Sequence, residues 1–322
     1  MKRISIITAL VAAVLSSCAK EQTPAACSAP NVKLNVSIPV SEMTRITDTG
    51  DEAAVDHAQV FVFREDGKID AWTISDSRDM IIDCTAGLRE VVAIVNAPRI
   101  SNIFDMEDLE KEITVLQDNR PGSLVMFGRK SVELKASSSV FVPVERLVAR
   151  VSIESIVPDF SLEQYMNADF RITGIYLTNV VGDISFIGTS EPSIWYNKMH
   201  DDVLGIDLIK TGDMSVQLAN GTAYQTVHHF YCYPNPTVED SFSVDWCPRH
   251  TRLVVETELA GRTCYYTMTM PAIESNHIYT VKELRITRPG SSDPELPVLP
   301  GDASFTIEVE DWEDGYSGSF EI

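Results

Sequence analysis

The chain has 322 residues, of which 44% are hydrophobic and 23% are charged, an ordinary composition for globular domains. This length is sufficient for two domains that each bury a sizeable core. The formal net charge of −21 argues against nucleic acid or an anionic membrane surface as a partner, because counterion release needs a basic patch.

The first 17 residues have the pattern of an export signal. A basic start precedes an apolar run at positions 4–15, which is too short to span a bilayer, and two serines come directly before Cys18. Residues 15–18 resemble a bacterial lipobox, in which the cysteine thiol is acylated, with palmitate for example. We therefore expect a lipoprotein signal peptide at 1–17 and a lipidated Cys18 that anchors a precursor in the outer membrane. An ordinary signal peptide followed by a chance cysteine is the alternative.

Residues 18–45 are expected to form a lipidated tether and one strand. Apolar and polar side chains alternate over 32–40, the period-two pattern of a strand with one buried face. Pro39 cannot donate a backbone hydrogen bond, which predicts an edge strand or a strand end. The polar stretch 41–48 predicts a loop whose only basic residue, Arg45, a trypsin-like protease could cut; a solvated loop charge is the alternative. The apolar positions of the strand are Val32, Leu34, Val36, Ile38 and Val40.

From residue 53 onward the pattern predicts successive short strands. Two hairpins are expected first, and their strands lie at 58–63, 69–74, 80–84 and 90–96. One helix follows, because Asp105 can cap it and apolar residues recur three and four positions apart at Met106, Leu109, Ile113 and Leu116. Further strands are predicted at 124–127, 132–135, 140–144 and 147–156. The break at 157–160 indicates a domain boundary, which separates an N-terminal domain at 46–157 from a C-terminal domain at 158–322.

The second half repeats this style with different spacing. Strands separated by glycine, proline and asparagine are predicted at 170–179, 183–187, 214–218, 226–233, 241–245, 251–259, 263–270 and 278–286. Regularly spaced short strands with little helix indicate an all-β fold of β-sandwich domains, with one or two short helices.

The C-terminal end, residues 303–322, differs from an ordinary last strand. It follows a proline-rich linker, and its apolar residues first occupy odd and then even positions, so the two segments cannot keep one face without a bulge or break. An apolar segment at a chain end is unusual. The apolar positions are Phe305, Ile307 and Val309, then Trp312, Tyr316, Phe320 and Ile322.

Enzyme, metal and cofactor sites find no support in the sequence. His228 and His229 are adjacent on a predicted strand, so their side chains point to opposite faces. The other histidines lack ligand spacing, and the acidic residues near 48–56 lack the spacing of a calcium loop. There is no nucleophile-elbow or phosphate-binding glycine motif. The cysteines at 84, 232, 247 and 264 form no Cys-x-x-Cys motif, and both disulfides and buried thiols stay open for them.

A series of short motifs in a fixed order carries a resemblance. The lipobox, the alternating strand and Thr44-Arg45 come first. The later motifs are Val60-Phe61-Val62-Phe63-Arg64-Glu65-Asp66-Gly67-Lys68, Val95-Asn96-Ala97-Pro98, Arg146-Leu147-Val148-Ala149-Arg150-Val151, Tyr233-Pro234-Asn235, Asn276-His277-Ile278-Tyr279 and Ile307-Glu308-Val309-Glu310-Asp311-Trp312. In this order the motifs resemble the fimbrillin family of Bacteroidia, whose members build type V pili.

The resemblance implies two tandem transthyretin-like β-sandwich domains and a way of assembly. A lipoprotein precursor reaches the cell surface, an Arg-specific protease cuts between Arg45 and Ile46, and the first strand leaves. A C-terminal strand of another pilin subunit, expected within 303–322, then fills the groove by donor-strand exchange, and the resulting fimbrium serves adhesion to a host receptor or glycan. The alternative is a non-polymerising surface lipoprotein, such as a pilus anchor, a tip or an adhesin, that keeps its first strand. A tail folded back into its own second domain is also open.

Overall fold

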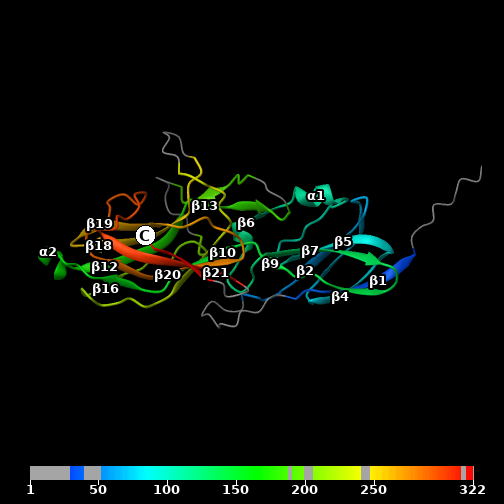
Figure 1. The fold of residues 1–322 in the computed structure, drawn as a ribbon, viewed down its shortest axis with the longest axis horizontal. Coiled ribbons are helices and arrows are strands. Elements are labelled where there is room, and N and C mark those ends of the chain that lie inside the picture. The colour runs from blue at the N-terminus through cyan, green and yellow to red at the C-terminus, as the bar shows by residue number, and fades with distance from the viewer. Residues whose placement is uncertain are drawn as a thin grey trace, which may run out of the picture.

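Short strands rich in β-branched and aromatic residues make up most of the structure, and they build an elongated molecule with two lobes (Figure 1). The computed structural model describes residues 30–39, 52–187, 191–198, 206–240, 247–312 and 317–321. Within these residues helix is confined to three short elements: α1 (Met106–Glu110), the 3-10 turn η1 (Leu116–Asp118) and α2 (Glu163–Met166). None of the helices in the described ranges is long and apolar enough to cross a membrane. The all-β class and the short helices predicted from the sequence are confirmed.

The first lobe is a sandwich of a three-stranded and a five-stranded sheet. The smaller sheet has the order β4-β1-β8, with β1 (Asn31–Ser37), β4 (Asp79–Thr85) and β8 (Ser138–Phe141). The larger sheet has the order β3-β2-β5-β7-β9, with β2 (Ala58–Arg64), β3 (Ile69–Ser75), β5 (Gly87–Val95), β7 (Met126–Leu134) and β9 (Glu145–Arg146). Apolar side chains from the facing sides of both sheets form one core. The other face of the larger sheet is covered by residues 97–109, which include α1.

The second lobe packs a six-stranded sheet on a four-stranded sheet around a separate core. The larger sheet runs β17-β10-β20-β21-β22, and β11 also pairs with β20. Its strands are β10 (Ala149–Ile153), β11 (Ile156–Pro158), β17 (His228–Cys232), β20 (His277–Ile286), β21 (Ala303–Asp311) and β22 (Ser317–Glu321). The smaller sheet runs β16-β12-β18-β19, with β12 (Phe170–Thr178), β16 (Val216–Leu218), β18 (Arg252–Leu259) and β19 (Arg262–Thr269).

Two short pairs of strands complete the described structure, and one of them joins the two halves of the chain. One pair is β13 (Val180–Val181) with β15 (Trp195–Tyr196). The other is β6 (Ile113–Val115) from the first half with β14 (Asp183–Ser185) from the second half. Phe186 and Ile187 then enter the core of the first lobe. The chain therefore crosses between the lobes more than once.

The sheets change lobe at a point earlier than the boundary expected at 157. The strand β9 belongs to the first lobe, whereas β10 and β11 pair with β20 of the second lobe. The pattern break at Pro158 is the end of β11. The change of sheet between Arg146 and Ala149 lies within the fifteen residues allowed on either side of the expected boundary. A change of partner sheet leaves no mark on the alternation of apolar residues, so periodicity does not place the boundary more closely.

Two elements differ from the sequence expectation. The helix capped by Asp105 is only five residues long, and Ile113 begins the strand β6 instead of continuing it. Asp105 does cap the helix, since its side chain accepts a hydrogen bond from the Asp108 backbone N–H. The strands expected at 124–127 and 132–135 are one strand, β7, because its polar middle lies in the sheet despite its charged side chains.

Candidate strand-exchange site

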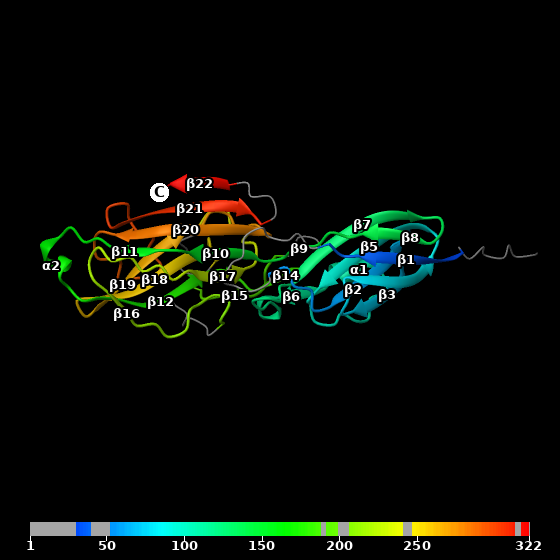
Figure 2. The same cartoon turned by 90° about the horizontal axis from the view of Figure 1, so that it is seen from below.

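The strand β1 lies in the middle of its sheet, between β4 and β8. Figure 2 shows it beside β8 in the first lobe. It pairs antiparallel with β4 along its whole length, from Asn31 opposite Thr85 to Ser37 opposite Asp79. It pairs in parallel with β8, which places residues 34–37 opposite residues 138–141. Pro39 comes after the strand, so it marks the strand end and not an edge strand. Removing β1 would leave two unpaired strand edges facing one groove.

The groove is apolar where β1 faces the core. The side chains of Val32, Leu34, Val36 and Ile38 are 0–8% exposed, whereas Lys33 and Asn35 point to solvent. Burying four such side chains contributes about 6–12 kcal/mol before entropy is subtracted, at about 1.5–3 kcal/mol each. A domain is stable by only about 5–15 kcal/mol, so an empty groove would not persist. Val40 lies outside the described residues.

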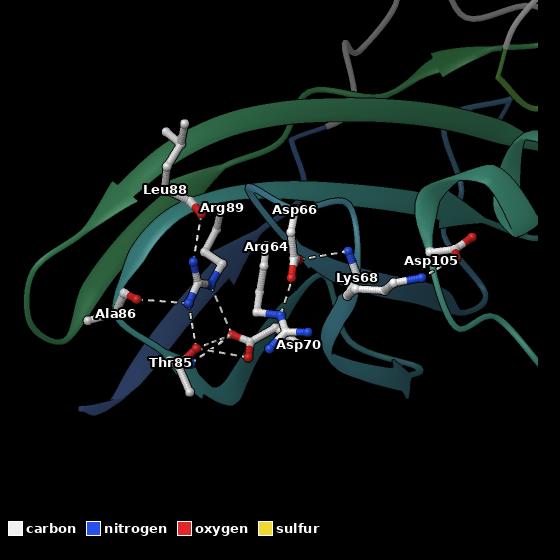
Figure 3. Close-up of polar contacts among 9 residues, drawn as sticks. All are labelled: Arg64, Asp66, Lys68, Asp70, Thr85, Ala86, Leu88, Arg89 and Asp105. Atoms are coloured by element: carbon white, nitrogen blue, oxygen red, sulfur yellow. Dashed lines mark hydrogen bonds and ion pairs between the residues drawn. The ribbon is translucent and has the colours of Figure 1, made fainter. Parts of the chain in front are cut away.

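A buried ion pair fixes the turn between β4 and β5 at one end of this groove (Figure 3). The Asp70 carboxylate accepts hydrogen bonds from Arg89 Nε at 3.0 Å, from the Thr85 backbone N–H at 2.7 Å and from Thr85 Oγ1 at 2.9 Å. The guanidinium also donates to the carbonyl oxygens of Ala86 and Leu88. Only 6% and 7% of the two charged side chains is exposed. A buried charged pair needs its remaining hydrogen-bonding groups satisfied, and these contacts provide that.

The same turn is hydrogen-bonded through its backbone to the residue that precedes the first strand. The N–H of Ala86 donates to the carbonyl oxygen of Pro30 at 2.9 Å, which extends the β1–β4 ladder by one bond. Gly87 has φ +121°, which favours glycine, and a Cβ there would lie 3.0 Å from a guanidinium nitrogen of Arg89. The ion pair belongs to β3 and β5, so it holds the turn independently of the strand that occupies the groove.

The other end of the groove lies toward the second lobe. The N–H of Ile38 donates to the carbonyl oxygen of Arg78, and the N–H of Val142 donates to that of Ser37, both at 3.0 Å. Arg45 and Ile46, the expected cleavage site, lie outside the described residues, as does the lipidation candidate Cys18. The described chain resumes at Glu52, which is buried.

The C-terminal segment has two parts with different environments. The strand β21 pairs with β20, and its residues Phe305 and Ile307 are buried in the core of the second lobe. Trp312 is also buried there, with 2% of its surface exposed, and Val309 packs against the same core. The strand β22, by contrast, pairs only with β21 at the edge of the sheet. Tyr316 and Ile322 lie outside the described residues, and Phe320 is placed only by its backbone pairing with Ile307.

Where the two lobes meet, five side chains form a buried group that we call the joint cluster: Glu52, Arg146, Arg150, Tyr231 and Trp312. The Glu52 carboxylate accepts from Arg150 at 2.6 Å and from the Tyr231 hydroxyl at 2.5 Å. Its backbone carbonyl accepts from Arg146 Nε at 3.1 Å. Both guanidinium groups lie over the Trp312 ring, at 4.8 and 5.3 Å, and the Tyr231 ring stacks on it.

The histidines and body cysteines that the structure describes are dispersed over both lobes. His228 contacts Tyr224 and His229 contacts Ser152, from opposite faces of β17. Cys84, Cys232 and Cys264 are buried thiols, and no disulfide joins the four body cysteines described. Burial raises the pKa of Cys232 to about 12, which keeps it protonated. No group of three or more metal-ligating side chains occurs among the residues described.

The ion pairs of the site were not predicted from the sequence. Asp70 and Arg89 are 19 residues apart, and Glu52 and Arg150 are 98 apart, so spacing alone does not connect them. Arg146 and Arg150 occupy even positions, whereas the apolar alternation of this strand is at odd positions. Alternation alone therefore places both arginines on the solvent side, and the structure buries them.

Comparison with known proteins identifies the fold. No family model and no curated protein matches the sequence. Among solved structures, a candidate cell adhesion protein from Bacteroides eggerthii matches with a TM-score of 0.67 and 16% identity, over 88% of this chain and 97% of that chain. A fimbrilin (FimA) from Porphyromonas gingivalis matches with 0.64 and 16%, over 88% and 98%. The tip fimbrial protein Mfa3 from the same species matches with 0.56 and 14%, over 88% and 100%. The chain therefore has the tandem β-sandwich fold of the fimbrilins.

Proposed function

We propose that the chain is a structural subunit of a surface fimbrium that serves adhesion, exported as a lipoprotein and assembled by exchange of β1 for a strand of another subunit. The observation that carries this proposal is the place of β1. It is central in a sheet and supplies four core side chains, yet it is connected to the rest of the body only through the segment that follows it. A single cut in that segment would separate the strand from the body.

Arg45 suits this role by its position. A cut after Arg45 by an Arg-specific protease leaves residues 46–51 ahead of the buried Glu52, so the folded body keeps its own contacts. The freed β1 is then held only by non-covalent contacts. A strand from another subunit can replace it through backbone pairing with β4 and β8 and through alternate side-chain pockets, which is β-augmentation.

Within the C-terminal segment the energetics favour β22 as the donated strand. Removing β21 would expose Phe305 and Ile307, at about 1.5–3 kcal/mol each, and would break its full ladder with β20. Removing β22 breaks only one ladder at the sheet edge. Residues 313–322 are ten in number, and the seven positions of β1 require about 23 Å of extended chain at about 3.3 Å per residue. The segment is therefore long enough to refill the groove.

Two engineered disulfides test this assignment in the full chain. Glu308 of β21 lies opposite Thr280 of β20 and opposite Ser319 of β22. The pair Thr280→Cys with Glu308→Cys would fix β21 to its own sheet, and the pair Glu308→Cys with Ser319→Cys would fix β22 to β21. Each oxidised protein is treated with a trypsin-like protease and examined for an SDS-resistant ladder, and its reduced form is the matched control.

We expect the protein with the 280–308 disulfide to form the ladder in both redox states, and the protein with the 308–319 disulfide to form it only when reduced. A ladder from the oxidised 308–319 protein would show that β22 is not the donor. A ladder lost only in the oxidised 280–308 protein would show that β21 must leave its own sheet together with β22. Absence of a ladder from every reduced form would favour a non-polymerising anchor, tip or adhesin.

A further inference from the structure

The joint cluster connects segments that are far apart in the sequence and that matter for exchange. Glu52 follows the segment that contains Arg45, and Trp312 precedes the tail segment 313–322. Arg146 ends the described first-lobe sheet at β9, and Arg150 lies in β10 of the second lobe. Figure 2 shows β21 ending where the two lobes meet. The cluster therefore lies at the base of the tail and also at the start of the chain that remains after cleavage.

The contacts of Trp312 hold its ring from several sides. The guanidinium carbons of Arg146 and Arg150 lie 4.8 and 5.3 Å from the ring centroid, and the Tyr231 ring lies at 6.4 Å with an interplanar angle of 18°. Cations over an indole face are attracted most strongly when the group is desolvated, as it is at 2% exposure. The tryptophan is thus fixed by charge and stacking as well as by burial.

The backbone at Trp312 is fixed by a second set of bonds. Its N–H donates to the carbonyl oxygen of Asn276 at 3.0 Å, and the Asn276 side-chain oxygen accepts from Arg146 at 3.3 Å. Asn276 has φ +57°, a left-handed conformation that asparagine tolerates better than most residues. Three of the motifs that carry the family resemblance, those at 146–151, 276–279 and 307–312, therefore meet at this one place.

Resting on the proposed function, we propose that the joint cluster is a clasp that keeps the base of the tail on its own subunit during exchange and so sets the position of the next subunit. With Trp312 held and residues 316–322 placed on the seven positions of the groove, residues 313–315 are left as the connection. The remaining three span about 10 Å. The clasp thereby keeps the groove of the next subunit close to this joint and limits bending between subunits.

Hydrogen exchange of the full chain tests the clasp without requiring a polymer. The variant Trp312→Leu removes the ring, and Trp312→Phe is the conservative rescue. Phe305→Leu is the matched control, because Phe305 is buried near the start of β21 and Trp312 directly follows the end of that strand. In the wild type we expect amides of β21 to be protected and those of β22 to exchange at least tenfold faster. Trp312→Leu should raise exchange at 309–311 at least tenfold and leave 303–305 unchanged, and Trp312→Phe should restore most of the protection.

Filaments from the same variants supply the second measurement. We expect Trp312→Leu to form a ladder, because the donated segment is intact, and to give filaments with at least a twofold shorter persistence length in electron micrographs. Phe305→Leu filaments should be as stiff as the wild type. Unchanged exchange at 309–311 in Trp312→Leu, or equal softening by Phe305→Leu, would overturn the clasp. A wild type with protected β21 amides but no ladder would contradict the proposed polymerisation. The joint cluster would then hold the base of the tail without setting the position of another subunit.

Discussion

Buried and exposed ion pairs lie within a few residues of each other in the first lobe, and they make a matched comparison (Figure 3). Asp70 is paired with Arg89 in a buried, hydrogen-bonded site. Arg64 Nε, by contrast, lies 3.4 Å from the Asp66 carboxylate, and 44% of the Arg64 side chain and 61% of the Asp66 side chain are exposed. Asp70→Ala leaves a buried guanidinium without its partner, which costs about 3–5 kcal/mol of unfolding free energy. Urea denaturation of the monomer measures the loss.

The control for this prediction is Asp66→Ala. Its exposed pair contributes less than about 1 kcal/mol, because water and salt screen it and the side chains must be ordered to meet. Similar losses for the two variants would show that the Asp70 pair does not stabilise the turn beside the first strand.

A pH dependence is expected from His228. Burial lowers the pKa of this histidine, and its ring also contacts the Tyr224 hydroxyl. The unfolded chain then binds a proton more readily than the folded chain, so stability is full above the unfolded pKa of about 6.5 and falls as the pH decreases below it. His228→Gln should reduce the loss of unfolding free energy between pH 7.5 and pH 5.5. If the loss of unfolding free energy were the same in His228→Gln, other titratable groups would be its cause.

For single residues, the sequence predicted which side chains are buried better than it predicted which charged side chains form ion pairs. Val32, Leu34, Val36 and Ile38 are buried as their alternation indicates. The partners of Asp70 and Glu52 are set by tertiary contacts between strands distant in sequence, which no local pattern records. A charge on the buried face of a strand shows that a partner exists but does not identify it.

Among the secondary-structure elements, β1 and β22 are the two strands that the proposed exchange removes from their own subunit, and they differ in position, because β1 is central in its sheet and β22 is at an edge. The strand β1 precedes the body of the chain, and β22 pairs with one neighbour at an edge. The strand β21, although adjacent to β22, contributes to the core. In the proposed exchange, the displaced strand and the donated strand are thus the first and the last strand of the described chain.

Deletion of residues 317–322 tests the role of the last strand. The truncated monomer should keep the unfolding midpoint of the wild type to within a few degrees, because the edge strand contributes little to the core. It should form no ladder after protease treatment, but it should still accept the tail of an intact subunit. Truncation from residue 303 is the contrasting variant and should destabilise the second lobe strongly, because it removes buried residues. Equal stability of the two truncations would contradict the different roles assigned to β21 and β22.

Element types were more predictable than element limits. Alternation predicted most strands to within a few residues, and the parity change after Val309 indicated the break that separates β21 from β22. The helix at 106–110 is shorter than its apolar spacing suggested, because Ile113 to Val115 pair with β14. Pairing with β14, which lies about 70 residues further along the chain, overrides the local helical pattern.

In the whole molecule, the two lobes form one elongated unit joined by the β6–β14 pair and by the joint cluster. The segment that contains Arg45 ends at this joint, at Glu52, and the C-terminal segment continues from it after Trp312. The sequence indicated two tandem sandwiches, and the structure confirms that class. The sequence did not locate the joint, because the chain passes from a first-lobe sheet to a second-lobe sheet between Arg146 and Ala149 without a change in its apolar pattern.

In the proposed assembly, removal of β1 lets the chain accept a strand from another copy or a related subunit. An SDS gel of the full chain after limited digestion with a trypsin-like protease tests this step, with Arg45→Ala as the matched control and the new N-terminus sequenced. We expect an N-terminus at Ile46 and an SDS-resistant ladder for the wild type, and neither for Arg45→Ala. Cleavage after Arg45 that releases β1 and yields only monomer would contradict the proposed exchange.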